Sequence, residues 1–320
     1  MMVIALLPSL IVLPMLANLS RSITQRQATA TLQTTAEAVS AQLSRGLLDQ
    51  WNEVKRLAEF AAQGDSRETM RLRLDTIVAT DQQYAWVGLA SPAGAVIVAS
   101  GGVLDGVSVS ERPWFKAGLT GAFAGDVHDA LLLQKFVAPN AKEPLRLIDL
   151  ALPVKRADGV PVGVLGAHVR WEAVREMFRM PRAGGSIELL LLSGEGTVLV
   201  GPASLEGKKL PASFALAAGQ GIGRSGVETW PDGRTYLTSV LPAVGSGDIP
   251  SFGWSLVARQ PTEVALVDTY AAASRMLPII ALCGVIIIAV SVGFAWWVAR
   301  PLSRLAKAAD QLSQGVTEAP

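Results

Sequence analysis

The stretch LRLIDLALPVKRADGVPVGVLGAHVRW, residues 145–171, decides the fold class of this chain. Two apolar runs rich in Leu, Val and Ala flank the turn residues Ala157, Asp158 and Gly159. Apolar runs on either side of a short turn that contains Asp-Gly predict a β-hairpin. The following EAVREMF predicts a short helix, so antiparallel strands and helices alternate in this part of the chain.

Hairpins of the same kind lie on both sides of this stretch. Residues 84–100 contain a strand, a Pro-Ala-Gly turn and a second strand, and residues 187–201 contain another hairpin. The segments RTYLTSVLPAV and GWSLVARQP supply two further strands, and a helix resumes near Thr262. Hairpins joined by short helices predict an α+β fold with two antiparallel-sheet modules, which we expect to meet near residues 181–185.

Two helices are expected before the first hairpin. Residues 20–63 predict one long helix, because they lack Pro, contain a single Gly and place apolar residues at helical spacing. A second helix is expected over residues 66–81, with Ser66 as its N-cap and Glu68 in its first turn. No repeat period is visible along the chain.

Both ends of the chain are apolar. Residues 276–298 carry no charge and finish with two tryptophans; they exceed the roughly 20 residues that a helix needs to cross a bilayer. Residues 1–19 are apolar but lack the preceding basic residues of an ordinary signal peptide. We expect a transmembrane helix there, clipped at its N-terminus, with a cleaved signal peptide as the alternative.

The charges beside the second apolar run predict the orientation. Arg300, Arg304 and Lys307 follow it closely, and such basic residues mark the cytoplasmic end of a span. Two spans would then place residues 20–275 in the periplasm of a bacterium, with the chain in the inner membrane.

Composition and motifs exclude several classes of function. The net charge of +1 and the lack of a basic stripe with aromatics argue against nucleic acid as a partner. The single cysteine excludes a disulfide within the chain. No catalytic triad, P-loop or metalloprotease motif is present, and GQGIGRSG, residues 219–226, follows no strand of a βαβ unit, so we assign it to a loop. We expect neither an enzyme nor a cofactor.

The segment RPLSRLAKAADQLSQGV after the second apolar run has heptad spacing. Pro301 suits the first turn of a helix, and the apolar heptad positions are Leu302, Leu305, Ala309, Leu312 and Val316. This segment resembles the first helix of a HAMP linker, of which we expect only this incomplete start within residues 299–320. A generic amphipathic juxtamembrane helix is the alternative.

The order of these elements resembles the double Cache sensors of bacterial chemoreceptors, histidine kinases and diguanylate cyclases. The segments RPWFKAG, DGVPVGVLGAHVRW and PSFGWSLVARQP carry the resemblance, and their order along the chain makes it specific. It implies a long N-terminal helix and two PAS-like antiparallel-sheet modules, flanked by two transmembrane helices. The expected domains are a first membrane helix (1–19), a stalk helix (20–63), a membrane-distal module (64–181), a membrane-proximal module (182–261), a connecting helix (262–275), a second membrane helix (276–298) and the HAMP start (299–320).

The resemblance also implies a ligand pocket in the distal module. Arg112 and Trp114 would line it, and Phe115 stands where ligand-binding relatives often carry Tyr. His128 lies near the position of a pocket Tyr, and His168 occupies the position of an Asp that binds the ammonium group of an amino acid. The amino-acid signature is therefore broken, and the resemblance does not imply an α-amino acid as the ligand.

The residue types in this predicted pocket suit a small anionic ligand. A guanidinium group matches a carboxylate or phosphate, and aromatic rings supply flat apolar walls. The candidate ligand-binding residues are Arg112, Trp114, Phe115, Asp126, His128, Asp129 and His168. Four of them have a structural alternative: Arg112 pairs with Asp105 or Glu111, Trp114 and His168 belong to the core, and Asp126 caps a turn.

We therefore expect the sensory half of a bacterial transmembrane receptor, which binds a small molecule and signals across the membrane. The expected homodimer packs through the long helix from Ser20, because coiled-coil signalling needs two chains. The output, a diguanylate cyclase, histidine kinase or chemotaxis domain, is not encoded here. The alternatives are a ligand-free adaptor and a membrane-tethered periplasmic metal-binding or hydrolytic protein that uses Asp126, His128, Asp129 and His168.

Overall fold

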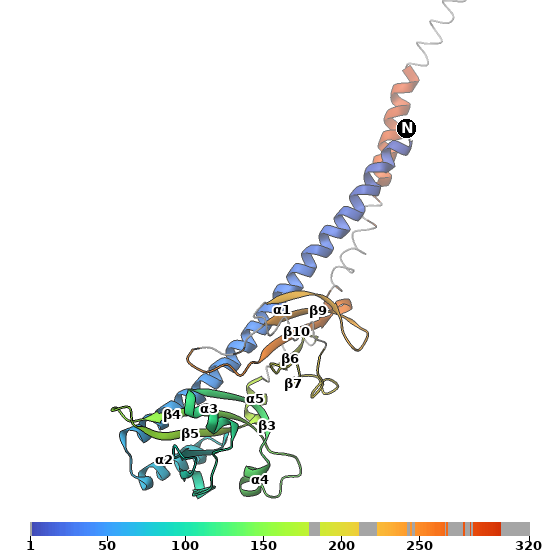
Figure 1. Ribbon diagram of the computed structural model, residues 1–320. Coiled ribbons are helices and arrows are strands. Elements are labelled where there is room, and N and C mark those ends of the chain that lie inside the picture. The colour runs from blue at the N-terminus through green and yellow to red at the C-terminus, as the bar shows by residue number, and fades with distance from the viewer. Residues whose placement is uncertain are drawn as a thin grey trace, which may run out of the picture. The chain divides into compact units, whose positions relative to one another are not determined.

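A computed structural model of the chain describes residues 2–178, 186–210, 223–241, 244, 247–265, 267, 278, 282 and 284–301 (Figure 1). The contacts within the chain define two units. Thr29–Thr262 forms one compact unit that contains every described strand, and Met1–Ala28 with Glu263–Pro320 forms the other.

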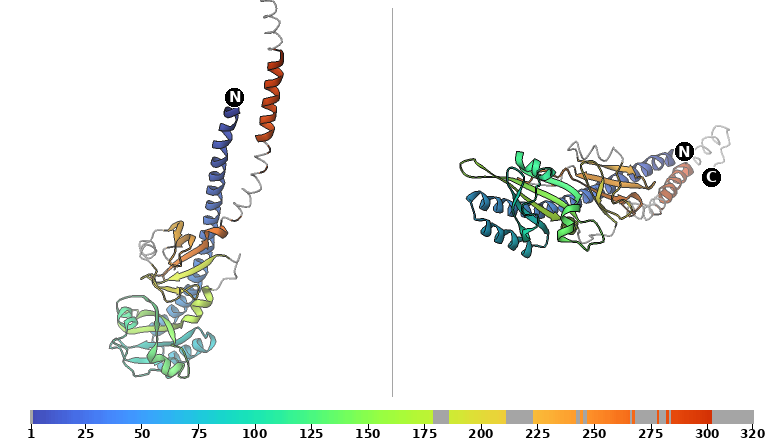
Figure 2. Two further views of the ribbon diagram at one scale, coloured as in Figure 1. Left: turned by 90° about the vertical axis from the view of Figure 1, so that its right-hand side faces the viewer. Right: turned by 60° about the horizontal axis from the view of Figure 1, so that its bottom comes forward.

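The N-terminal helix α1 runs without a break over Met2–Gln63. Within the compact unit, one face of α1 is buried, as its apolar spacing predicts; the buried residues include Leu32, Ala36, Val39, Leu43, Leu47, Trp51, Val54 and Leu57. Gln42 Nε2 donates to the Met177 carbonyl at 3.2 Å, and Lys55 Nζ pairs with Asp248 at 3.3 Å. The helix therefore lies against both sheet modules (Figures 1 and 2).

The second helix, α2, spans Arg67–Thr80 and begins as the sequence predicts. Ser66 is its N-cap, and its hydroxyl accepts a hydrogen bond from Thr69 N at 3.2 Å. Backbone hydrogen bonding and the Ser66 hydroxyl lower the pKa of Glu68 in the first turn. This negative charge at the helix start is favourable because it complements the helix dipole.

The predicted central hairpin is present in the first sheet. Its strands β4 (Arg146–Lys155) and β5 (Pro161–Arg170) pair antiparallel through the turn at Gly159, which has a φ of 83°. Beside them lie β1 (Tyr84–Ala90), β2 (Val96–Ala99) and β3 (Phe123–Asp129), and the strand order is β2-β1-β5-β4-β3.

Short helices join the strands of this first module. They are the 3-10 turn η1 (Ser100–Gly102), α3 (Pro113–Thr120), α4 (Leu131–Val137) and α5 (Trp171–Phe178). Helix α3 packs closely on the sheet because glycine faces its bulky Trp114. A Cβ atom added at Gly166 of β5 would lie 2.5 Å from Trp114 Cζ3.

The second sheet repeats the topology of the first. Its strands are β6 (Glu188–Leu192), β7 (Val198–Val200), β8 (Arg224–Thr229), β9 (Thr235–Leu241) and β10 (Ser255–Pro261). Their order, β7-β6-β10-β9-β8, matches the first sheet strand for strand. A repeat invisible in the sequence is therefore present in the topology, and the two PAS-like modules and the α+β class are confirmed.

One loop assignment was wrong in part. Residues 224–226 of GQGIGRSG belong to the edge strand β8, whereas its residues 219–222 lie outside the described part of the chain. Strand β8 has an exposed or half-exposed side chain at every position. An edge strand of this kind lacks the apolar run that identifies a buried strand, so the sequence pattern does not reveal it.

The C-terminal part contains one apolar helix that is long enough to cross a membrane, Gly284–Pro301, among the residues that the structure describes. It overlaps the predicted span at residues 276–298. Helix α7 begins at Thr262, as predicted, and is described to Ala265. The first membrane helix and the module boundaries stay predictions, and residues 181–185 and the heptad positions Leu302, Leu305, Ala309 and Leu312 lie outside the described residues.

The close packing of α3 on the sheet predicts the effect of a larger residue at Gly166. Gly166→Val should destabilise the protein by about 1–3 kcal/mol, because the new methyl groups collide with a rigid indole ring. Gly226→Val is the matched control, since nothing lies within 4 Å of a Cβ added there. Thermal unfolding of the full chain in detergent compares them, and equal melting temperatures would contradict this account of the packing.

Candidate functional site

A pocket of about 580 Å³ lies in the first module, between the sheet and helices α3 and α4. The structure brings most of the predicted site residues to its wall: Arg112, Trp114, Asp126, His128, Asp129 and His168. Phe115 is buried but is not among the residues that line the pocket. It packs edge-on against Trp114, with 5.9 Å between the ring centroids. Phe115 therefore contributes to the pocket through Trp114, whose position it helps to fix.

A row of three side chains from adjacent strands forms the floor of the pocket. The strand registers place Trp86 of β1 opposite His168 of β5, and His168 opposite Asp149 of β4. The His168 Nδ1 and Asp149 Oδ1 atoms lie 2.6 Å apart, and both side chains are buried. The Trp86 ring stacks on the imidazole at 5.0 Å, while Trp114 meets it edge-on at 5.6 Å. His168 is therefore held on three sides.

The other histidine approaches the same carboxylate from the edge of the sheet. His128 follows a shift in the register of β3, and its Nε2 lies 3.7 Å from Asp149 Oδ2. That distance is too long for a hydrogen bond. Asp149 thus lies between both histidines of the chain, bonded to one and open toward the other.

Asp149 is a site residue that the sequence analysis missed. A signal was available, because Asp149 interrupts the apolar run LIDLAL in a central strand. A carboxylate is almost never fully buried without a partner. Its partner could not be identified from spacing, since the partner lies on the neighbouring strand.

Two cations line the pocket, and neither has an ion pair or a side-chain hydrogen bond within the described part of the chain. Arg112 is the exposed N-cap residue of α3, and Lys135 lies exposed in the last turn of α4. The two acidic residues that the sequence suggested as partners of Arg112 are paired with other cations. Asp105 pairs with two other arginines, and Glu111 pairs with Lys116 at 2.6 Å, which lowers the pKa of Glu111.

The carboxylates in the pocket wall, in contrast, are all engaged. Asp126 Oδ1 accepts from Trp254 Nε1 at 2.7 Å and from Val127 N at 2.7 Å. Asp129 lies 3.8 Å from Arg146, and Asp149 holds His168. Within the described structure, each of these carboxylates therefore has at least one partner, whereas the two cations have none.

The geometry gives no support to the metal-binding alternative. Within the described residues, no group of three or more His, Cys, Asp or Glu side chains is arranged to hold a metal ion. His168 Nδ1 faces a carboxylate instead, and Asp126 is bonded to an indole.

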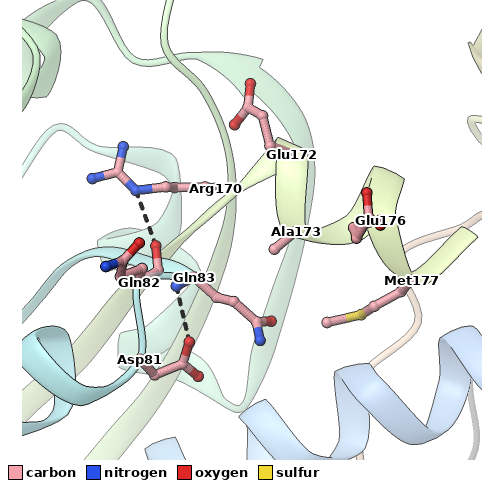
Figure 3. Close-up of a pocket in the computed structure, with 8 residues that line it drawn as sticks. All are labelled: Asp81, Gln82, Gln83, Arg170, Glu172, Ala173, Glu176 and Met177. Carbon is pink, nitrogen blue, oxygen red and sulfur yellow. Dashed lines mark hydrogen bonds between the residues drawn. The ribbon is translucent and has the colours of Figure 1, made fainter. Parts of the chain in front are cut away.

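A second hollow, of about 550 Å³, lies where β5 runs into α5 (Figure 3). Its polar groups partly bond to one another: Arg170 Nε donates to the Gln82 carbonyl, and Gln83 N donates to Asp81 Oδ1. Among the described residues, no aromatic side chain lines it. The pocket between the first sheet and helices α3 and α4 is the better candidate for ligand binding, because it combines aromatic walls with cations that have no partner in the described structure.

Comparison with known proteins identifies the family. A family model described as Cache domain matches residues 20–268, which is most of the chain, so the chain belongs to the Cache domain family. Cache domains are ligand-sensing modules, and the chain is accordingly a sensor domain rather than an enzyme. No curated protein matches the chain.

Several solved structures share the fold. The ligand-binding domain of the Pseudomonas aeruginosa amino acid chemoreceptor PctB, in complex with L-arginine, has 18% identity and a TM-score of 0.55, covering 74% of this chain and 96% of that one. The Pseudomonas fluorescens CtaA domain with L-serine has 17% identity and a TM-score of 0.56, covering 74% and 99%. The Campylobacter jejuni Tlp3 domain with 4-methylisoleucine has 11% identity and a TM-score of 0.58, covering 76% and 94%.

The buried Asp149–His168 pair predicts that Asp149 contributes more to the stability of the protein than Asp129 does. Asp149→Ala should lower the stability by about 1–3 kcal/mol, because it leaves a buried His168 nitrogen without a partner. Asp129→Ala, which removes an exposed carboxylate of the same pocket, should change it by less than about 0.5 kcal/mol.

Thermal unfolding followed by circular dichroism measures both effects on the full chain in detergent. Asp149→Asn keeps an oxygen acceptor and should recover part of the loss. If Asp149→Ala melts at the same temperature as Asp129→Ala, the pair does not stabilise the pocket.

Proposed function

We propose that this chain is the ligand-sensing input region of a bacterial transmembrane receptor, and that the pocket of the first module binds a small anionic molecule. One observation carries the proposal. The cations that line the pocket, Arg112 and Lys135, have no partner in the described structure, while the carboxylates around them are engaged.

Two cations on different helices, both without a partner in the described structure, favour a ligand with two negative charges. Arg112 is the N-cap residue of α3 and Lys135 belongs to α4, so the two cations reach the pocket from two helices. A guanidinium group binds a carboxylate through two parallel hydrogen bonds, and an ammonium group acts as a compact point charge. A short dicarboxylate or a phosphate satisfies both cations, and the rings of Trp86 and Trp114 can pack on the methylene groups of a dicarboxylate.

A zwitterionic amino acid is the second candidate, and Asp149 supports it. Among the described residues, Asp149 Oδ2 makes no hydrogen bond, and His128 Nε2 lies 3.7 Å from it, so this oxygen can accept a hydrogen bond from an ammonium group. This carboxylate lies directly across the strand pair from His168, the position where the resemblance implied an Asp. The chemoreceptor domains with the same fold were solved in complex with L-arginine, L-serine and 4-methylisoleucine.

The receptor part of the proposal rests on the family and on the apolar C-terminal helix. Helices at residues 1–19 and 276–298 would span the inner membrane and leave residues 20–275 in the periplasm. The chain would act as a homodimer through its stalk helix. Pro301 and the heptad residues after it would begin a HAMP linker toward a cyclase, kinase or chemotaxis output.

A thermal-shift screen of the full chain in detergent tests the ligand class. The panel contains dicarboxylates of three to six carbons, monocarboxylates, inorganic phosphate, amino acids and the neutral amides of the same acids. We expect the largest stabilisation from a dianion, because it satisfies both cations. Stabilisation by neutral amides alone would contradict the proposal.

Substitution of the cations then locates the site. Arg112→Ala and Lys135→Ala should each weaken binding of the stabilising acid about tenfold, the loss expected for one charge-assisted hydrogen bond. Arg156→Ala and Lys142→Ala are matched controls, since both remove exposed cations of the same module that do not line the pocket. Unchanged affinity in Arg112→Ala and Lys135→Ala would place the ligand elsewhere.

A further inference from the structure

A hydrogen bond connects the wall of the pocket to the second module. Trp254 Nε1 donates to Asp126 Oδ1 at 2.7 Å. Asp126 lies in β3 of the first sheet and lines the pocket. Trp254 immediately precedes β10 of the second sheet and does not line the pocket.

The indole end of this bond is held rigidly. Trp254 is completely buried. Its ring stacks on Phe252 at 4.5 Å and meets Trp171 edge-on at 5.8 Å, and Trp171 is the first residue of α5 in the first module. The indole N–H direction is therefore fixed by packing from both modules.

The carboxylate end, in contrast, lies where the strand is irregular. The pairing of β3 with β4 shifts register between Gly125 and His128, so Asp126 and Val127 form a bulge. Bulges re-aim side chains and are common beside functional sites. Here the bulge directs Asp126 toward Trp254, and after it His128 faces Asp149. The shape of this pocket edge therefore depends on what holds Asp126.

We propose that Trp254 is a positioning residue of the ligand pocket and acts through Asp126. This rests on the proposed function of the pocket as an anion site. The indole N–H keeps the Asp126 carboxylate engaged, so that this carboxylate does not pair with Arg112 or Lys135. Without the indole, Asp126 competes with an anionic ligand for those cations.

The same bond makes the pocket and the second sheet interdependent. Strand β10 is paired on both sides within its sheet and continues directly into α7. If a bound anion changes the strength of the Asp126–Trp254 bond, then by linkage the state of that bond changes anion affinity equally. Pocket occupancy is thereby communicated to the strand that leads to the C-terminal helix.

The first arm of the test needs no ligand. Amide hydrogen exchange is measured on the full chain in detergent for Trp254→Phe, which keeps an aromatic ring but removes the donor. Exchange in β3 around residues 125–128 should become at least about fivefold faster. Trp230→Phe is the matched control, because it removes an indole donor to Thr238 within the second module. Unchanged exchange in β3 for Trp254→Phe would overturn the proposal.

The second arm separates positioning from general loosening, with succinate as the probe. Trp254→Phe should weaken succinate binding about fivefold, whereas Trp230→Phe should not change it. In an Asp126→Ala background Trp254→Phe should have less than about a twofold effect, because no carboxylate remains to be held. Asp126→Asn keeps an oxygen acceptor for the indole but removes the negative charge, so it should abolish the dependence on Trp254 as Asp126→Ala does, because a neutral amide does not compete with the anion for the cations.

The outcomes distinguish this proposal from the proposed function. An equal loss of affinity in the wild-type and Asp126→Ala backgrounds would overturn the role through Asp126. If succinate does not bind the wild-type chain but exchange in β3 accelerates only in Trp254→Phe, then the tie between the modules is supported, and the assignment of succinate-like anions to the pocket fails.

Discussion

The register of the β4–β5 hairpin is the constraint on which the candidate site depends. It places Asp149 opposite His168, and the neighbouring β1 register places Trp86 beside the same histidine. Because side chains alternate between the faces of a sheet, a slip of one residue would move Asp149 to the other face. The buried carboxylate and imidazole would then each lose their partner. The Asp149–His168 pair therefore both depends on the register and favours it.

The two modules show how one topology gives two different interiors. In the second sheet, the guanidinium carbon of the buried Arg259 lies 4.1 Å from the ring centroids of both Trp230 and Tyr236, and its Nε donates to Glu188 at 2.7 Å. The charge of this cation is thus met inside the module. In the first sheet, the cations Arg112 and Lys135 face a hollow and have no such partner in the described structure. This contrast is why we assign ligand binding to the first module.

Local patterns predicted much of the fold, because they act over a few residues. The central hairpin follows from apolar runs around an Asp-Gly turn, and the start of α2 follows from Ser66 as its cap. Strand β8 and helix α4 were not predicted. An exposed edge strand and a helix of about two turns both lack a distinctive period of apolar residues. The strand order that the two sheets share could not be predicted either, because the two modules have the same topology without a repeated sequence.

The candidate site was predictable only where the family resemblance supplied positions. It indicated Arg112, Trp114 and both histidines, but not Asp149, whose partner lies on another strand. Lys135 carries no local signal, and Trp254 reaches the pocket wall from a distant part of the chain. Within the described part of the chain Arg112 has no ion pair, and this could not be foreseen either, because Glu111 and Asp105 are close to it in sequence but bond to other cations.

The central claim is that unmet positive charge in the first module selects an anionic ligand. Calorimetric titration of the full chain tests it most directly, using the acid that gives the largest thermal shift and the neutral amide of the same shape. The account predicts that the acid binds at least about tenfold more tightly than the amide, and that this preference disappears when both Arg112 and Lys135 are replaced by Ala. Equal affinity for acid and amide, or a preference that survives the double substitution, would contradict it.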